Sequence, residues 1–214
     1  MLVERNGAAP HVADTAWVAS TAQLVGEVVV GPGCAIDHGA LIVSGGPPIR
    51  LGRGVAVMPG AVIRSTGGPS RPEFPVDIGD ECLIGPQAAL AGCTLGDAVY
   101  VATQVMIFHG ARVGDGCRLG AGSVVHTGAH VPDRTRVGLR QFAVARAGAP
   151  ALVTGDLDAA RTALARADFF GTVFDIDPDD QQDIVELHRR TTRALTSELR
   201  ALEHPRDERS REEP

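Results

Sequence analysis

The sequence predicts a mainly β protein built as a parallel β-helix, and two observations carry that prediction. Aliphatic residues recur every six positions along the chain, a period typical of a β-helix in which three hexads form one coil of about 18 residues. A glycine or another small residue usually follows each of them, as tight corners between strands require. In the central stretch the recurring residues are Ile78, Ile84, Leu90, Leu95, Val101, Ile107, Val113, Leu119, Val125, Val131 and Val137.

The interior of such a coil also accounts for the small residues that lie four places after the aliphatic ones. Cys82 and Cys117 occupy that position, where only a small side chain fits. A β-sandwich is the alternative, but it predicts irregular spacing with hairpin turns such as Asn-Gly, and Asn6 is the only asparagine. The four cysteines lack Cys-x-x-Cys spacing, so we expect reduced core residues rather than a redox motif or a structural zinc site.

In chain order, the β-helix is expected between a short lead-in and a helical segment. Residues 1–11 are the lead-in, and the repeat occupies residues 12–149. A Gly- and Pro-rich run at residues 65–75 has no aliphatic residue in phase, which predicts a loop that projects from the β-helix. Loops on a rigid scaffold often carry binding groups, so Arg71 and Glu73 are candidates.

Residues 150–203 form the helical segment. Spacing predicts one helix over residues 156–169, and an acidic run at residues 175–180 marks the start of a second helix that reaches about residue 203. The charged residues 204–214 are expected to be disordered. The apolar face of the first helix comprises Leu157, Ala160, Leu164 and Ala167.

Composition limits the class of protein. The chain has 214 residues, of which 44% are hydrophobic and 21% charged, enough for one domain with a sizeable core. A net charge of −6 offers no electrostatic attraction to nucleic acid or to an anionic membrane surface. No lysine is present, which excludes Schiff-base chemistry. Because no apolar run approaches 18 residues and no basic leader precedes one, we expect a cytoplasmic protein that does not enter a membrane.

Five short segments of the chain carry a family resemblance. They are HVADTAWVA at residues 11–19, GEVVVGPG at 26–33, PIRLG at 48–52, AGCTLGD at 91–97 and GAPA at 148–151. These segments resemble the γ-class carbonic anhydrase branch of the hexapeptide-repeat proteins, and the resemblance covers roughly residues 10 to 152. It implies a left-handed β-helix that assembles as a homotrimer, with active sites between neighbouring subunits.

The same resemblance implies a metal site that this chain does not keep. The family binds zinc, iron or cobalt through three histidines and leaves an open position for the water that attacks carbon dioxide. Those histidine positions fall on Arg64, Pro86 and Ala91, and the family's pocket glutamine falls on Met58. A guanidinium has no lone pair to give a metal, and Pro and Ala side chains have no donor. We therefore expect no zinc at the family site.

What remains of the cleft is apolar with one fixed positive charge. Met58, Pro86 and Ala91 supply apolar walls, and Arg64 supplies the charge. Such a pocket suits a small organic anion. In the alternative interpretation the cleft has closed, and Arg64 pairs with an acid such as Glu73 or Asp77 at the trimer interface.

Three function classes follow. In the first, a small anionic metabolite is bound or converted without metal, held by Arg64, with His109 or Glu73 as acid or base. In the second, the protein is an acyltransferase that uses acetyl-CoA or another acyl-CoA, with His109 or His126 as base. In the third, it is a non-catalytic scaffold or partner subunit.

The column of residues that ends the third strand of each coil is expected to run through Arg64, Ala91, Phe108 and His126. Phe108 thereby joins the candidate ligand-binding residues. A relocated metal site from His109, His126 and His130 would need a geometry different from that of the family, and we give it little weight.

Overall fold

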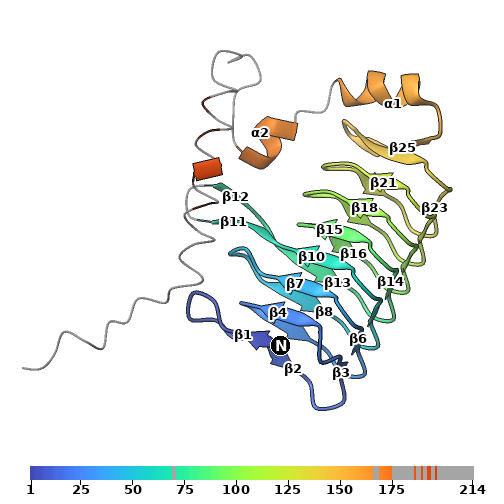
Figure 1. The fold of residues 1–214 in the computed structure, drawn as a ribbon. Helices are drawn as coiled ribbons and strands as arrows, with labels where there is room; N and C mark the ends of the chain where they lie inside the picture. The colour runs from blue at the N-terminus through green and yellow to red at the C-terminus, as the bar shows by residue number, and fades with distance from the viewer. Residues whose placement is uncertain are drawn as a thin grey trace, which may run out of the picture. The chain divides into compact units, whose positions relative to one another are not determined.

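The predicted β-helix of hexapeptide repeats is confirmed. The computed structural model describes residues 1–68, 71–165 and 169–174, together with Glu186, Arg189, Thr192, Arg193 and Thr196. The chain divides into two units, residues 1–175 and residues 176–214. In the first unit, short strands stack coil upon coil from β1 to β24 and form three faces of parallel strands, while β11, β12 and β25 pair antiparallel (Figure 1).

Each full coil contributes one strand to each face. Within a face, the strands of successive coils pair with one another. Face 1 contains β1 (Leu2–Val3), β4 (Gln23–Val25), β7 (Leu41–Val43), β10 (Val62–Arg64), β15 (Ala89–Ala91), β18 (Met106–Ile107), β21 (Val124–Val125), β24 (Phe142–Arg146) and β25 (Ala149–Thr154). Face 2 contains β2 (His11–Val12), β5 (Val28–Val30), β8 (Ile49–Leu51), β13 (Val76–Ile78), β16 (Thr94–Leu95), β19 (Arg112–Val113) and β22 (His130–Val131). Face 3 contains β3 (Trp17–Val18), β6 (Ala35–Ile36), β9 (Ala56–Val57), β14 (Leu83–Ile84), β17 (Tyr100–Val101), β20 (Arg118–Leu119) and β23 (Arg136–Val137).

The hexad residues stack inside the three faces as the period requires. Ile63 pairs with Leu90, and Leu90 pairs with Ile107; all three are buried. The four cysteines are also buried and free, which agrees with the expected core role. Burial raises the pKa of the Cys82 thiol to about 11 and that of Cys93 to about 12, so both thiols stay protonated and unreactive at neutral pH.

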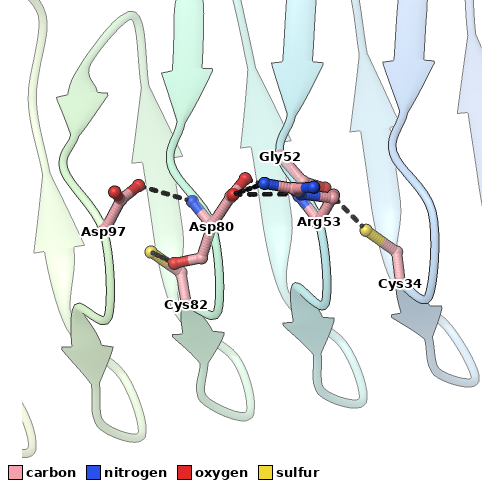
Figure 2. A network of polar contacts seen from close by, with 6 residues as sticks. All are labelled: Cys34, Gly52, Arg53, Asp80, Cys82 and Asp97. Carbon is pink, nitrogen blue, oxygen red and sulfur yellow. Dashed lines mark hydrogen bonds and ion pairs between the residues drawn. The ribbon is translucent and has the colours of Figure 1, made fainter.

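The turns from face 2 to face 3, which we call the aspartate corner (residues 52–55, 79–82, 96–99, 114–117 and 132–135), repeat the same contact from coil to coil. The carboxylate of Asp80 accepts a hydrogen bond from the Arg53 N–H at 2.8 Å, and the Asp80 N–H donates to Asp97 at 2.8 Å. Asp97 and Asp115 continue the ladder by donating to the next aspartate. Figure 2 shows Asp80 between Asp97 and Arg53. Each carboxylate thus satisfies a backbone donor of the preceding coil.

Residues 65–75 leave the β-helix as predicted, but they are more regular than a loop. Thr66–Gly68 (β11) and Arg71–Phe74 (β12) form an antiparallel hairpin. Its base is fixed by the buried Ser65 hydroxyl, which accepts from the Gly45 N–H at 3.0 Å and donates to the Pro47 carbonyl. The sequence did not predict this hairpin, because its Gly- and Pro-rich strands lack the alternation of apolar and polar residues that is typical of β-strands.

Both ends of the β-helix differ from the expected boundaries. Within the expected lead-in, β1 already pairs with β4, so the stacking begins at Leu2. At the other end β25 turns back antiparallel against β24, and strand structure continues to Thr154. Antiparallel pairing after a tight turn covers the last coil's open edge, which would otherwise expose unpaired backbone groups.

Two helices follow in the first unit, α1 (Leu157–Leu164) and α2 (Phe169–Phe174). The Asp156 side chain caps α1 by accepting from the N–H groups of Asp158 and Ala159. Ala160 is buried as expected, but Leu157 is 56% exposed, so it does not belong to the buried face. Most of the predicted second helix and the tail lie outside the described residues. Among the described residues, no helix is long and apolar enough to span a bilayer.

Candidate functional site

The turns from face 1 to face 2 bring most of the candidate residues together. We call this the site corner (residues 43–48, 64–75, 91–93, 108–111 and 126–129). Arg64 pairs in register with Ala91 and with Val43. The pairing of β15 with β18 and of β18 with β21 carries the column on to Phe108 and His126. The column predicted from the repeat is therefore confirmed.

One coil at this corner is a residue short. Leu90 pairs with Ile107, 17 residues later, whereas Ile107 pairs with Val125, 18 residues later. The Gly110 N–H donates to the Gly92 carbonyl at 2.7 Å, so these two glycines stack. The coil that contains Gly92 consequently has no residue at the level of His109. Phe74 from the hairpin lies there, because a Cβ placed on Gly92 would overlap Phe74 Cβ.

Two half-buried imidazoles lie at the site corner, each beside an aromatic ring. The His109 and Phe74 rings meet edge to face, with centroids 5.3 Å apart and planes at 74°. The His126 ring lies 5.6 Å from that of Phe108, tilted by 36°. Burial lowers the pKa of both histidines, and the positive charge of Arg64 lowers that of His109 further. Both imidazoles are therefore mainly neutral at pH 7.

Arg64, at the end of β10, brings a positive charge to this corner. Its side chain is exposed, and no ion pair joins it to any described residue of the chain. Asp77, one of the two acids considered as its partner at a trimer interface, pairs with Arg50 at 3.5 Å within the chain. Glu73, the other, is exposed on β12 next to Phe74. A guanidinium left open to solvent beside a neutral imidazole suits an anionic ligand.

Met58 and Pro86 lie elsewhere in the same chain. They belong to the turns from face 3 to face 1, at the other end of the strands that lead to the site corner. Within one chain they are therefore not neighbours of Arg64 and Ala91.

The family's metal does not fit the residues at its positions. Arg64, Pro86 and Ala91 offer no lone pair to a metal ion. In the described part of the chain, no three His, Cys, Asp or Glu side chains are arranged as metal ligands. His130, considered for a relocated site, lies on β22 of face 2 and pairs with Arg112.

Phe74 is the residue of this corner that the sequence did not single out. The short coil was visible as the five-residue spacing from Leu90 to Leu95 in an otherwise six-residue repeat. A break in register at a corner leaves space for a side chain from elsewhere, but nothing in the pattern says which one. A hollow of about 760 Å³ away from the site corner was not anticipated. It lies between the β24–β25 hairpin and α1 and is lined by Ala145, Arg146, Ala147, Ala149, Leu152, Ala159, Thr162 and Ala163.

Comparison with known proteins agrees with this architecture. No family model matches the chain. Gamma carbonic anhydrase 1, mitochondrial, of Arabidopsis thaliana is 27% identical over 125 residues, which are 58% of this chain and 46% of that protein. Gamma carbonic anhydrase 3, mitochondrial, of the same plant is 34% identical over 96 residues, which are 44% of this chain and 37% of that protein. The chain thus spans less than half the length of these relatives.

Solved structures show the same fold. A hexapeptide transferase family protein from Anaplasma phagocytophilum superposes with a TM-score of 0.55 at 24% identity, covering 77% of this chain and 94% of that one. UDP-N-acetylglucosamine O-acyltransferase from Moraxella catarrhalis superposes with a TM-score of 0.52 at 16% identity, covering 75% of each chain. The chain is a hexapeptide-repeat β-helix protein with γ-class carbonic anhydrase homologues at low identity. Because those homologues are named as mitochondrial, the cytoplasmic location stays a prediction.

Proposed function

We propose that this protein binds or converts a small organic anion at the site corner without the metal of its γ-class relatives. Arg64 is the anchor for the anion, and Ala91 and Phe108 supply apolar surface beside it. The observation that carries the proposal is the exposed Arg64 guanidinium, which lies close enough to His109 to lower its pKa. A cation and a neutral imidazole together can hold a carboxylate and exchange a proton with it or with a second reactant.

In this proposal His109 is the acid or base, since a mainly neutral imidazole can accept a proton at pH 7. His126 lies one coil further along the column and is the second candidate. Glu73, exposed on β12 next to Phe74, is the third candidate. The substrate class is a small carboxylate or acyl compound, because one guanidinium matches one carboxylate.

The proposal includes a homotrimer, in which the site corner of one copy meets Met58 and Pro86 of the next. This arrangement would bring the two separated groups of candidate residues together. It is supported by exposed apolar side chains on face 1, where Val62 is 38% and Met106 43% exposed. Such side chains next to a polar corner are typical of a surface that is covered in an assembly.

The proposal is tested by thermal denaturation with acetate, propionate or benzoate. A ligand at ten times its Kd stabilises the folded state by about 1.4 kcal/mol, which raises the Tm by roughly 3–5 °C for a chain of this length. We expect this rise in the wild type and in Arg50→Ala, a control that removes an arginine from face 2. Arg64→Ala should abolish it. If no carboxylate raises the wild-type Tm, the proposal is wrong.

An acyl-CoA acyltransferase is the second candidate, favoured by the neutral state of His109, which a base that deprotonates a hydroxyl or amine must have. Acetyl-CoA at millimolar concentration belongs in the same experiment. A rise in Tm with acetyl-CoA but not with the carboxylates would favour this candidate. If no ligand raises the Tm and Arg64→Ala only lowers it, Arg64 has a structural role. That result would favour the third class of function, a non-catalytic scaffold or partner subunit.

A further inference from the structure

The short coil and the hairpin together build a feature that the proposed function does not use. The hairpin is inserted between β10 and β13 and returns to the β-helix at Phe74, directly over Gly92. A Cβ on Gly92 would lie 3.3 Å from His109 Cδ2, and a Cβ on Gly110 would lie 3.5 Å from Phe74 Cε1. Phe74 and His109 therefore share one small space beside Gly110 and Gly92, and a side chain on Gly92 would overlap Phe74.

Three sets of contacts fix the position of Phe74. At the base of the hairpin, Ser65 is hydrogen bonded to the neighbouring loop through Gly45 and Pro47. Across the hairpin, Phe74 pairs with Thr66. On the outside, α2 packs against β12, with Val173 buried (Figure 1). A side chain held in this way keeps one position relative to its neighbour.

We propose that Phe74 is a positioning residue, inserted in the gap of the short coil to fix the ring of His109 and to keep water from one side of it. The proposal rests on the proposed function only in taking His109 as the acid or base. Phe74 does not touch the ligand; it acts through the imidazole. The edge-to-face contact sets the orientation of the ring.

The two causes of the lowered pKa of His109 can be varied separately. Burial is the main reason for its lowered pKa, and Arg64, at the end of β10, is the second. Arg71 and Glu73 on β12 and His126 on the next coil are further charged or titratable residues on the elements packed nearby. Removing the Phe74 ring lets water reach His109 and stabilise the imidazolium. The effect of Arg64 remains in such a variant.

The matched control is the second aromatic–histidine pair of the same corner. Phe108 lies against His126, whose lowered pKa has burial as its cause. Changing Phe108 should therefore act on His126, and changing Phe74 should act on His109. A general loosening of the fold would move both histidines in either variant.

The experiment is a titration of the histidine side chains by NMR, on protein with ¹³C-labelled histidine and without ligand. His109→Gln and His126→Gln assign the two resonances. In Phe74→Ala we expect the pKa of His109 to rise toward the ordinary value of about 6.5, with His126 unchanged; Phe74→Leu should give a smaller rise. In Phe108→Leu we expect the reverse selectivity.

The proposal is overturned if Phe74→Leu and Phe74→Ala leave the His109 titration as in the wild type while circular dichroism shows the native fold. If Phe74→Ala does not fold, Phe74→Leu decides alone. Because no ligand is present, a failure of carboxylates to protect the protein would refute the proposed function without touching this result. Conversely, carboxylate protection with an unmoved His109 titration would refute only the role of Phe74.

Discussion

The aspartate corner and the site corner occupy equivalent places on the same β-helix, yet they are built differently. At the aspartate corner, Asp80, Asp97, Asp115 and Asp133 repeat one contact over successive coils (Figure 2). At the site corner the column that directly follows the buried aliphatic residue, one position before the place of the aspartates, changes from Arg64 to Ala91, Phe108 and His126, and one coil loses a residue.

The difference distinguishes residues that maintain the repeated fold from residues that are free to serve a function. A repeated side chain satisfies a need that every coil has, such as a partner for a backbone N–H. A column that changes at each coil meets no common need, so its residues are available for a ligand. In a solenoid, each coil contacts only its neighbours, and one face can therefore diverge while the others hold the fold.

Breaking the repeated corner should have the largest effect. A Cβ on Gly79 would lie 2.6 Å from the carbonyl carbon and oxygen of Gly96 and would overlap the Asp97 carboxylate. Gly79→Ala should therefore lower the free energy of unfolding by roughly 2–3 kcal/mol, as overpacking does. At the site corner, Gly128 has φ +65° and open space, so Gly128→Ala should cost only about 1 kcal/mol of backbone strain. Urea denaturation measures both, and equal losses would contradict the comparison.

The sequence predicted the fold because the aliphatic period is dictated by the interior, which every coil shares. Leu90 and Ile107 are buried as the hexads require. The antiparallel strand β25 and the hairpin at 66–74 have no such period, since each pairs with one neighbour only. The outward exposure of Leu157 was missed for a related reason: helical spacing identifies a face, but a short helix after a turn need not bury all of it.

The candidate site was predictable in part. Register alone placed Arg64, Ala91, Phe108 and His126 in one column, because stacking follows the repeat length. Phe74 could not be found in that way, since it enters the corner from outside the repeat. Nor does any pattern in one chain say whether Met58 and Pro86 meet that column across a subunit boundary.

Two buried serines, Ser65 and Ser123, give predictions of intermediate effect on stability. Ser65, at the site corner, is buried with both its hydrogen bonds made, and Ser65→Ala should cost about 1–2 kcal/mol because the Gly45 N–H and the Pro47 carbonyl each lose a partner. Ser123 is also buried, but its hydroxyl has no hydrogen-bond partner among the described residues. The preceding coils place Ala88 and Val105 at its position.

Ser123→Ala should accordingly raise the free energy of unfolding by about 1 kcal/mol, since an unsatisfied polar group is removed from the core. Chemical denaturation of the two serine variants, run side by side, gives the measurement. A loss of stability in Ser123→Ala would mean that its hydroxyl is hydrogen bonded after all. If Ser123→Ala is stabilised as expected, the serine at this interior position is a tolerated defect of the repeat, unlike the outward-facing changes at the site corner.

The smallest expected effect concerns the pH dependence of the aspartate corner. The Arg53 N–H, followed by the Arg53 side chain, holds the pKa of Asp80 below its ordinary value. A carboxyl whose folded-state pKa is depressed stabilises the fold above the unfolded-state pKa of about 3.9, and that contribution is lost as the pH falls through the lower folded value. Urea midpoints of the wild type should therefore decline below about pH 4, and Asp80→Asn should decline less. Arg53→Ala keeps the N–H and should retain most of the wild-type slope. If Asp80→Asn declines as steeply as the wild type, other carboxyl groups dominate, and the ladder is held by its hydrogen-bond geometry rather than by its charge.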